Sequence, residues 1–348
     1  SIMKYYNVKS KYNSLSELDS LLNKKYKNVV FLILDCVGTN IIENNLNKNS
    51  ILRKNLVTNV TTVFPPATAA ATTAIHSGLS PYESGWIGGM PYFKEYNKAI
   101  VLFTGNDFYT GEKVIEKPEN NILKYETIYE KIVKHNKNIK YHQCFPNFQE
   151  NGSNTFEELC EKIKQSCHNN EKNIVSAYWD EPDHTIHHTG TNSQEVKEVL
   201  KNIDDNLKKL SQELDNTIII ITADHGATDL KEIYINEIKE IDDCLSFPPN
   251  IESRFVNFFI KDGMKEQFVK ALENNFKDKY ILYTKEEFLN SGLLGKGTPH
   301  KRINDYFGDY IVIMTGDLSI RYITEEIKKV HLADHSGITK EEMIVPLI

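Results

Sequence analysis

"NVVFLILDCVG", residues 28–38, is an uninterrupted apolar run that ends in a carboxylate, Asp35. Two later stretches have the same design: "NIVSAYWDEPDH" at residues 173–184 and "NTIIIITADHG" at residues 216–226. Apolar, β-branched runs without polar alternation are typical of strands buried on both faces of a parallel sheet. The three stretches therefore predict three central strands, each followed closely by an acidic side chain.

Helical patterns separate these predicted strands. "TFEELCEKIKQSC", residues 155–167, opens with the capping-box pair Thr155 and Glu158, and residues 192–214 carry an apolar stripe at helical spacing. Strands that alternate with helices predict an α/β fold, a doubly wound, mostly parallel sheet flanked by helices. Because ligands of such folds bind at the carboxyl ends of the strands, we expect the acidic residues to converge there.

The domain organisation is predicted from the length of the chain and from a change in its residue pattern. A chain of 348 residues can form one large α/β domain with an insertion, and we predict a single domain over residues 1–348. Between residues 247 and 309 the pattern changes to "RFVNFFIKDG", a helix-like "MKEQFVKALENNF" and then "YILYTKEEF". We predict that residues 247–309 form a small inserted cap.

Composition excludes several function classes. The net charge is -7 and no long basic run occurs, so neither a nucleic-acid polymer nor a membrane surface is an expected partner. No apolar run approaches twenty residues and the first residues are polar, which favours a cytoplasmic protein. Five cysteines without a CxxC pair argue against a disulfide framework or a Cys-rich zinc site, and predict buried thiols.

"DEPDHTIHHTG", residues 180–190, combines acidic and histidine side chains. Asp183 and His187 are four residues apart, so a helical turn would place a hard oxygen donor beside an imidazole on one face. A hydrogen-bonded Asp-His pair on a loop is the structural alternative. The roles of Asp180, His184 and His188 stay open.

Two further stretches offer adjacent Asp and His residues. "TADHG" holds Asp224 and His225 at a predicted strand end, and "ADHSG" holds Asp334 and His335 near the C-terminus. Mixed carboxylate and imidazole donors suit zinc or manganese better than calcium, which prefers oxygen alone. We therefore expect two divalent metal ions, with zinc favoured and manganese as the alternative.

"VFPPATAAATTAIHSG", residues 63–78, could be a buried helix, but its start also suits a phosphate site. Pro65 and Pro66 fit a helix entry and place Thr68 in the first turn, where free N–H groups and the helix dipole stabilise a phosphate. Alanines 69–71 add no bulk near the hydroxyl. A threonine hydroxyl is a poor nucleophile unless a metal or a base lowers its pKa.

The ordered set of these motifs resembles the alkaline phosphatase superfamily. The matching parts are Asp35 after the first strand, Thr68 ten residues before Gly78, "EPDHTIH", "TADHG" and the late His335. The closer likeness is to the nucleotide pyrophosphatase/phosphodiesterase branch, which uses a threonine nucleophile. That resemblance implies two metal sites: one at Asp183, His187 and His335, the other at Asp35, Asp224, His225 and the Thr68 oxygen.

The sequence departs from its relatives at two points. Residues 85–89, Gly-Trp-Ile-Gly-Gly, stand where eukaryotic-type phosphodiesterases carry an asparagine, which leaves nucleotide specificity open. Alkaline monoesterases bind the phosphate of the substrate with an arginine. No comparable arginine lies near Thr68 in this sequence, since the nearest is Arg53. Sulfatases modify a Cys or Ser at the nucleophile position, so Thr68 disfavours that activity.

The resemblance implies a two-metal phosphoesterase that cleaves small phosphodiesters or pyrophosphates through a threonyl-phosphate or nucleotidyl-threonine intermediate. A phosphomonoesterase or a metal-dependent phosphomutase of the same fold is the first alternative, and an inactive metal-binding module is the second. The sequence does not give the oligomeric state. Loop residues 295–302, with Lys296, His300, Lys301 and Arg302, could meet an anionic substrate or simply be solvated, and Trp86, Tyr92 and Phe93 could stack on a base or be buried.

Overall fold

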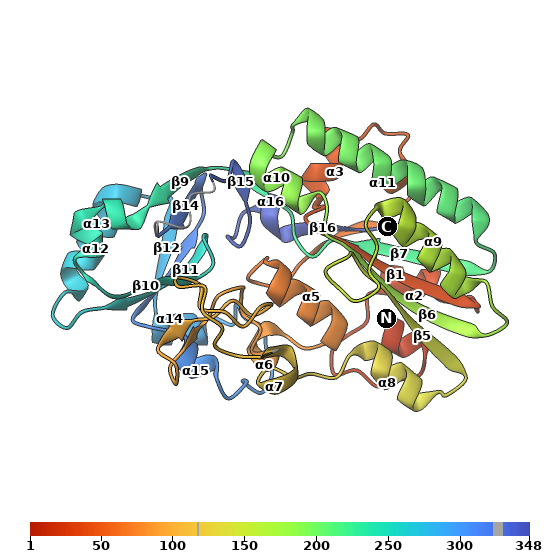
Figure 1. Ribbon diagram of the computed structural model, residues 1–348, viewed down its shortest axis with the longest axis horizontal. Helices are drawn as coiled ribbons and strands as arrows, with labels where there is room; N and C mark the ends of the chain where they lie inside the picture. The colour runs from red at the N-terminus through yellow and green to blue at the C-terminus, as the bar shows by residue number, and fades with distance from the viewer. Residues whose placement is uncertain (117, 323–329) are drawn as a thin grey trace.

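The computed structural model describes residues 1–116, 118–322 and 330–348 (Figure 1). Within these residues the largest sheet has six strands, in the order β2-β16-β7-β1-β6-β5. Their bounds are β1 (Asn28–Leu34), β2 (Thr58–Thr61), β5 (Ile139–Cys144), β6 (Lys172–Trp179), β7 (Thr217–Thr222) and β16 (Ile344–Leu347). Strands β7, β1, β6 and β5 are parallel, and β16 runs antiparallel to β2 and β7. The predicted mostly parallel α/β sheet is confirmed.

The three predicted acidic strands are neighbours and end at the same level. In the parallel register Leu34 of β1 pairs with Trp179 of β6, and Ile33 pairs with Thr222 of β7. All seven residues of β1 are buried, as its uninterrupted apolar run requires. The register therefore brings the residues that follow β1, β6 and β7 to one edge of the sheet.

Helices cover both faces of this sheet (Figure 1). Val30, Leu32 and Leu34 of β1 pack in one hydrophobic cluster with one set of helices, whereas Val29 and Phe31 pack in another cluster with a second set. The first set is α3 (Thr39–Asn45), α4 (Ile51–Lys54), α9 (Phe156–Cys167) and α11 (Gln194–Glu213); the second is α1 (Ile2–Tyr5), α2 (Ser16–Leu21) and α8 (Ile128–His135), with Ile75 of α5 (Thr68–Ser77) against it. The alternation of β1 side chains thus fixes a three-layer core.

The start of α9 differs in one detail from the predicted capping box. The Thr155 side chain accepts a hydrogen bond from the backbone N–H of Glu158, as expected. The Glu158 carboxylate, however, accepts from the N–H of Asn154 at 2.8 Å rather than from Thr155. The reciprocal half of the box is therefore displaced by one residue.

A second, antiparallel sheet lies at the other end of the molecule (Figure 1). Its order is β10-β11-β13-β12, from β10 (Leu245–Ile251), β11 (Phe255–Ile260), β12 (Tyr280–Thr284) and β13 (Tyr310–Met314). The same part of the chain contributes α12 (Lys239–Asp242), α13 (Lys265–Phe276), α14 (Lys285–Asn290) and α15 (Ile303–Tyr306). This sheet overlaps the residues 247–309 for which the sequence predicts a cap; that domain assignment stays a prediction.

Short elements complete the described chain. They are α6 (Pro81–Ser84), α7 (Pro118–Asn121), α10 (Asp183–Thr189), α16 (Lys340–Met343), a 3-10 turn (Ile235–Glu237), and the strand pairs β3 (Tyr92–Phe93) with β4 (Lys98–Ala99), β8 (Thr228–Asp229) with β15 (Ala333–Asp334) and β9 (Lys231–Tyr234) with β14 (Leu318–Arg321). In the ranges that the structure describes, no helix has the length and apolar character needed to cross a bilayer. All five cysteines are buried free thiols, which confirms that prediction.

Candidate metal centre

Three carboxylates meet at the carboxyl edge of the large sheet. Asp35 directly follows β1, Asp183 opens α10 after β6, and Asp224 lies two residues after β7. Asp35 is 3% exposed and Asp224 is fully buried. Each has an oxygen without a hydrogen-bond partner among the described residues: Asp35 Oδ1, Asp183 Oδ1 and Asp224 Oδ2. Buried carboxylate oxygens are costly unless a charge compensates them, so this arrangement fits bound cations.

The electrostatics of these groups reflect their crowding. Burial raises the pKa of Asp224 to about 7. Burial, reinforced by the charges of Asp224 and Asp183, holds the pKa of Asp35 well above its ordinary value. Burial also acts against ionisation of Asp183, but the facing His187 and His335 outweigh it and lower the pKa of Asp183. The site therefore lacks positive charge on the side of Asp35 and Asp224.

Three histidines each direct Nε2 towards these carboxylates and Nδ1 towards a backbone carbonyl. The Nδ1 atoms of His187, His225 and His335 lie 2.9, 3.2 and 3.0 Å from the backbone carbonyls of Ala333, Gly226 and Pro66. A carbonyl can only accept, so each Nδ1 carries a proton and each Nε2 is directed away from the backbone carbonyl. Burial lowers the pKa of His225, and lowers the pKa of His335 to about 4, so the Nε2 atoms of these two rings keep a lone pair. The Asp183 carboxylate outweighs burial and raises the pKa of His187 to about 10, so a bound cation would replace a proton at His187 Nε2. Metal-binding histidines are usually held in this way, through a hydrogen bond from the second ring nitrogen.

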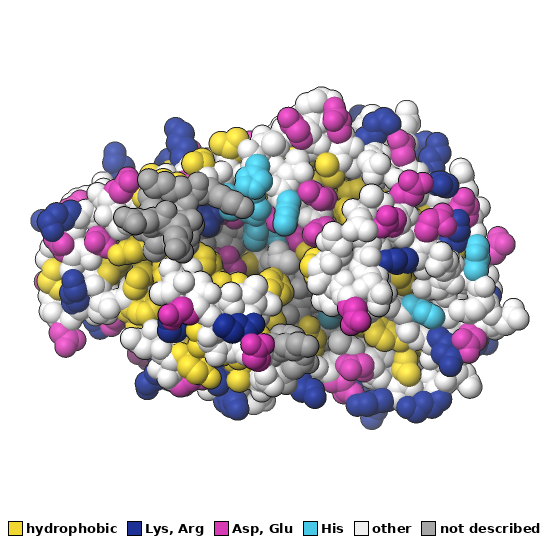
Figure 2. All heavy atoms as spheres, in the orientation of Figure 1, with side chains coloured by type: hydrophobic (Ala, Val, Ile, Leu, Met, Phe, Trp, Pro, Cys, Tyr) yellow, Lys and Arg dark blue, Asp and Glu magenta, His cyan; other side chains and the backbone are white. Residues whose placement is uncertain are grey.

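The donor atoms form two adjacent groups, each within a span of 4.8 Å. In the first, the Nε2 atoms of His187 and His335 lie 3.3 and 3.9 Å from the Asp183 carboxylate. In the second, His225 Nε2 lies 3.4 Å from Asp35 and 3.6 Å from Asp224. The rings of His225 and His335 stack with centroids 3.8 Å apart, which joins the groups. Figure 2 shows histidine side chains gathered in a hollow of the surface.

Thr68 is the first residue of α5 and points its hydroxyl at the second group. Its Oγ1 lies 3.1 Å from His225 Nε2. Ala67 precedes the helix in an extended conformation and supplies no side-chain cap, so the first amides of α5 stay available to a ligand. The structure thus brings all seven residues of the predicted site together; their roles as nucleophile and ligands stay predictions.

Sequence reasoning missed the residues that hold these groups. The Tyr178 hydroxyl donates a hydrogen bond to Asp35 Oδ2. Asp334 accepts from Arg321 and Ser253, both at 2.7 Å, and so fixes the turn that carries His335. Tyr178 stands in the same quoted stretch as Asp183, so its place near a strand end was a usable signal. The contacts of Arg321 and Ser253 have no comparable signal in the sequence.

Several residues left open by the sequence lie apart from the donor groups or have structural partners. His184 and His188 are exposed. Trp86 is 3% exposed and donates from Nε1 to the Leu123 carbonyl, and Phe93 is also buried, so both belong to the core. Arg302 forms an ion pair with Glu95. These contacts favour the structural alternative for Trp86, Phe93 and Arg302.

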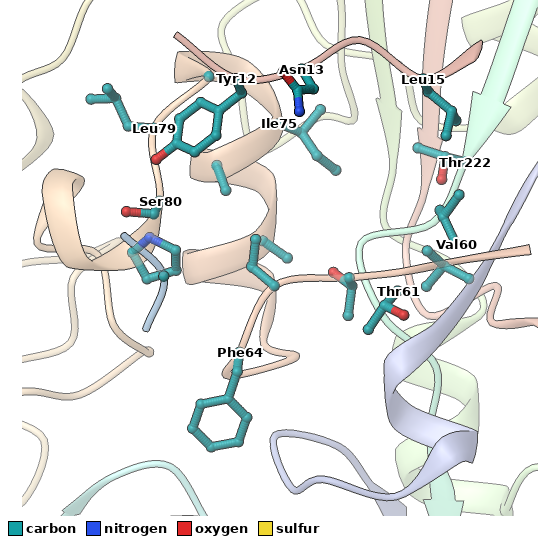
Figure 3. A pocket seen from close by; sticks show the side chains of 18 of the residues that line it. Tyr12, Asn13, Leu15, Val60, Thr61, Phe64, Ile75, Leu79, Ser80 and Thr222 are labelled. Atoms are coloured by element: carbon teal, nitrogen blue, oxygen red, sulfur yellow. The ribbon is translucent and has the colours of Figure 1, made fainter. Parts of the chain in front are cut away.

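A separate apolar cavity of about 770 Å³ lies beside α5 (Figure 3). It is open to solvent on one side and is bordered by the N-terminal segment, β2, α5 and the loop 292–296. Its lining includes Tyr12, Leu15, Val60, Phe64, Ile75, Leu79 and Thr222. None of the seven predicted site residues lines it. Residues 292–296 therefore contribute to this cavity, whereas the sequence left open whether their loop overhangs the substrate site.

Comparison with known proteins gives the family. The model of the type I phosphodiesterase/nucleotide pyrophosphatase family matches residues 29–324. The chain belongs to this family. Its members are metal-dependent hydrolases of phosphoric ester and anhydride bonds, and the resemblance seen in the sequence is confirmed.

Individual relatives of this phosphodiesterase family member match over shorter stretches. Human ectonucleotide pyrophosphatase/phosphodiesterase family member 5 is 30% identical over 158 residues, 43% of this chain and 33% of that protein. Rat family member 7 is 29% identical over 134 residues, 33% of this chain and 29% of that protein. The matched region thus spans about a third of the length of these curated relatives.

Solved structures show the same fold across nearly the whole chain. Murine family member 5 superposes with a TM-score of 0.66 at 19% identity, covering 92% of this chain and 87% of that one. An inactive threonine-to-alanine variant of that murine protein, in complex with AMP, has a TM-score of 0.68 at 19% identity and covers 93% of this chain and 87% of that one. Phosphonoacetate hydrolase from Sinorhizobium meliloti, in complex with phosphonoformate, has a TM-score of 0.64 at 13% identity and covers 92% and 88%.

Proposed function

We propose that this protein is a two-metal phosphodiesterase that uses Thr68 as its nucleophile. The observation that carries the proposal is the set of buried oxygens without a hydrogen-bond partner on Asp35, Asp183 and Asp224, beside three histidines whose rings are oriented by Nδ1 hydrogen bonds to backbone carbonyls. The Thr68 hydroxyl lies 3.1 Å from one of those nitrogens. Membership of the phosphodiesterase family supports the same reaction class.

Two divalent ions fit the two donor groups. Asp183, His187 and His335 would hold one ion, and Asp35, Asp224, His225 and the Thr68 oxygen would hold the other. Oxygen donors mixed with imidazoles favour zinc, with manganese as the alternative. When bound, such ions lower the pKa of a hydroxyl and neutralise the charge of the transferring phosphoryl group.

Residues of the chain bind the substrate, attack the phosphorus and release the product. The amides at the N-terminus of α5 donate hydrogen bonds to the phosphate oxygens of the substrate, and the hydrogen bond from His225 Nδ1–H to the Gly226 carbonyl keeps the ring turned towards Thr68. Thr68 Oγ1 forms a bond to phosphorus while the bond to the leaving oxygen breaks, and the threonine proton passes to that oxygen. Water then hydrolyses the threonyl ester and restores the hydroxyl.

The substrate that we propose is a small phosphodiester or pyrophosphate. Arg53, the arginine nearest to Thr68 in sequence, donates to the carbonyls of Glu43 and Leu46 and is engaged in structure rather than in gripping a monoester. The AMP bound to the murine relative makes a nucleotide product a reasonable first test. Five unpaired thiols support a reducing compartment, and we propose a cytoplasmic location.

The first experiment compares bis-p-nitrophenyl phosphate with p-nitrophenyl phosphate on the metal-loaded protein. We expect faster cleavage of the diester and its loss on chelation. Thr68→Ala should lower kcat/KM for the diester by about 10³-fold or more, because the attacking oxygen is removed. Thr68→Ser keeps a hydroxyl and is the matched control, with most of the activity retained.

Each alternative gives a different result. Preference for the monoester would indicate a phosphatase, and an isomerised phosphoester without free phosphate would indicate a mutase. A metal-loaded protein that turns over neither substrate nor a panel of nucleotide diesters would be a binding module. Wild-type turnover by Thr68→Ala would exclude the threonine mechanism even if the protein cleaves diesters.

A further inference from the structure

Cys36 lies between the two donor groups. Its sulfur belongs to a third cluster of donor atoms within 4.8 Å of one another, together with Asp183 and His225. Asp183 is a member of the first group of the proposed centre and His225 is a member of the second. In the described chain the other four cysteines join no such cluster, although they are buried too.

The backbone at Cys36 is unusual for a residue with a side chain. Its φ is +62°, in the left-handed region that glycine adopts without cost and other residues adopt at a cost. The N–H of Cys36 donates to Asp224 Oδ1 at 3.2 Å, so the residue is tied to the carboxylates through its main chain as well. A glycine would adopt this conformation and donate this hydrogen bond equally well. Neither feature therefore explains why this position carries a side chain.

Independent evidence that this space takes a ligand comes from the carboxylates. Asp35 Oδ1 and Asp224 Oδ2 have no partner among described residues, and both belong to side chains at least 96% buried. They lie 3.4 and 3.6 Å from Nε2 of His225, a residue that also clusters with the Cys36 sulfur. The sulfur therefore faces the space where a cation would compensate these oxygens.

We propose that Cys36 is a further metal ligand, a thiolate placed between the two ions. This inference rests on the proposed two-metal centre and adds a soft donor to its oxygen and nitrogen set. Binding forms one metal–sulfur bond and releases the thiol proton to solvent. Thiolate ligands favour zinc over the harder manganese, so Cys36 gives the centre selectivity for zinc.

The test uses cobalt(II) as a spectroscopic substitute for zinc. Wild-type protein loaded with cobalt should show an intense near-ultraviolet sulfur-to-cobalt charge-transfer band besides the visible bands of bound cobalt. Cys36→Gly suits the left-handed backbone and should fold, bind cobalt and lack the near-ultraviolet band. Cys160→Ser, at a buried cysteine outside the clusters, is the matched control and should keep it. The ratio of zinc to manganese affinity should fall about tenfold or more in Cys36→Gly only.

The outcomes separate this inference from the proposed function. Visible bands without the near-ultraviolet band in the wild-type protein would overturn the thiolate ligand and leave diester cleavage intact. The same band persisting in Cys36→Gly would assign the sulfur elsewhere and also overturn it. Failure of wild-type protein to bind cobalt or zinc would overturn both the ligand and the two-metal centre.

Discussion

Tyr178 orients the carboxylate of Asp35 in the proposed metal centre. Its hydroxyl donates to Asp35 Oδ2, which leaves Oδ1 as the oxygen without a partner. Tyr178→Phe removes that hydrogen bond while the ring stays in place. Because residues that orient metal ligands typically contribute about 10- to 100-fold in metal affinity, we expect a loss in this range in zinc titrations.

Tyr129→Phe is the matched control for this substitution. The Tyr129 hydroxyl is buried and has no partner within the described ranges, so its removal should leave the zinc affinity unchanged. Equal losses of zinc affinity in both variants would show that removal of any buried hydroxyl weakens zinc binding through a general loss of stability. Unchanged affinity in Tyr178→Phe would show that Asp35 is held without it.

At the scale of single residues, the sequence predicts the donors better than their supports. Asp35, Asp183 and Asp224 each follow a recognisable strand, so their convergence can be predicted from the fold. The hydrogen bond from Tyr178 to Asp35 joins residues 143 positions apart. Such a contact depends on the rotamers of packed side chains, which no local pattern encodes.

Helix α5 contributes to two different sites along its length. Thr68 begins the helix at the proposed metal centre, whereas Ala74 and Ile75 line the apolar cavity of about 770 Å³. Ala74→Leu places a larger apolar side chain into this space and keeps a good helix former. We expect the free energy of unfolding to rise by about 0.5–2 kcal/mol, the usual gain on filling a cavity.

Ala70→Leu on the same helix should have the opposite effect. Ala70 is fully buried and does not line the cavity, so the added atoms would overpack the core at a cost of about 1–3 kcal/mol. Urea unfolding of both variants measures the difference. Equal destabilisation by the two substitutions would mean that the cavity cannot accommodate a leucine from α5.

Elements differ in how far the sequence predicts them. The apolar runs of β1 and β6 are unambiguous because these strands are buried on both sides along nearly their whole length. The run of β7 is as apolar in sequence, although only Ile220 and Ile221 are buried and its other residues are half-buried. The edge strand β2 has four residues with two exposed positions, and β16 contains Pro346 and runs antiparallel, so neither carries the signal of a buried parallel strand. Their pairing is determined by the rest of the sheet.

For the molecule as a whole, bound metal should contribute to stability. Asp35 and Asp224 are buried with unpartnered oxygens, so removal of a compensating cation leaves repulsion in the core. A ligand at about 100 times its Kd stabilises the folded state by about 2.7 kcal/mol. We therefore expect a chelator to lower the Tm by several degrees in calorimetry.

Thr68→Ala is the control for the chelation experiment. It removes the nucleophile but retains three carboxylates and three imidazoles, so a metal-dependent Tm shift should persist in an inactive protein. Identical Tm values with and without chelator, in both proteins, would contradict a metal centre at this position.

A buried ion pair connects the second sheet to the turn that carries His335. Arg254 and Glu342 are both fully buried, and the guanidinium binds the carboxylate through two contacts of 2.7 and 3.0 Å. Arg254 directly precedes β11, and Glu342 belongs to α16. Glu342 also accepts from the N–H of Gly337 at 2.7 Å, two residues after His335. The pair thus couples the packing of one sheet to His335, a proposed metal ligand at the edge of the other.

Glu342→Gln removes the negative charge and leaves the Arg254 guanidinium buried without compensation. Breaking one side of a buried pair typically costs about 3–5 kcal/mol, so we expect a loss of this size in urea unfolding, together with weaker zinc binding through the loosened turn of His335. Glu341→Gln, at the exposed neighbouring position, should change stability by less than about 0.5 kcal/mol. If stability falls in Glu342→Gln while zinc affinity is unchanged, the pair supports the second sheet alone. If neither changes, the guanidinium is satisfied by its bonds to the Gly316 and Leu318 carbonyls, at 2.9 and 2.6 Å, without the carboxylate charge.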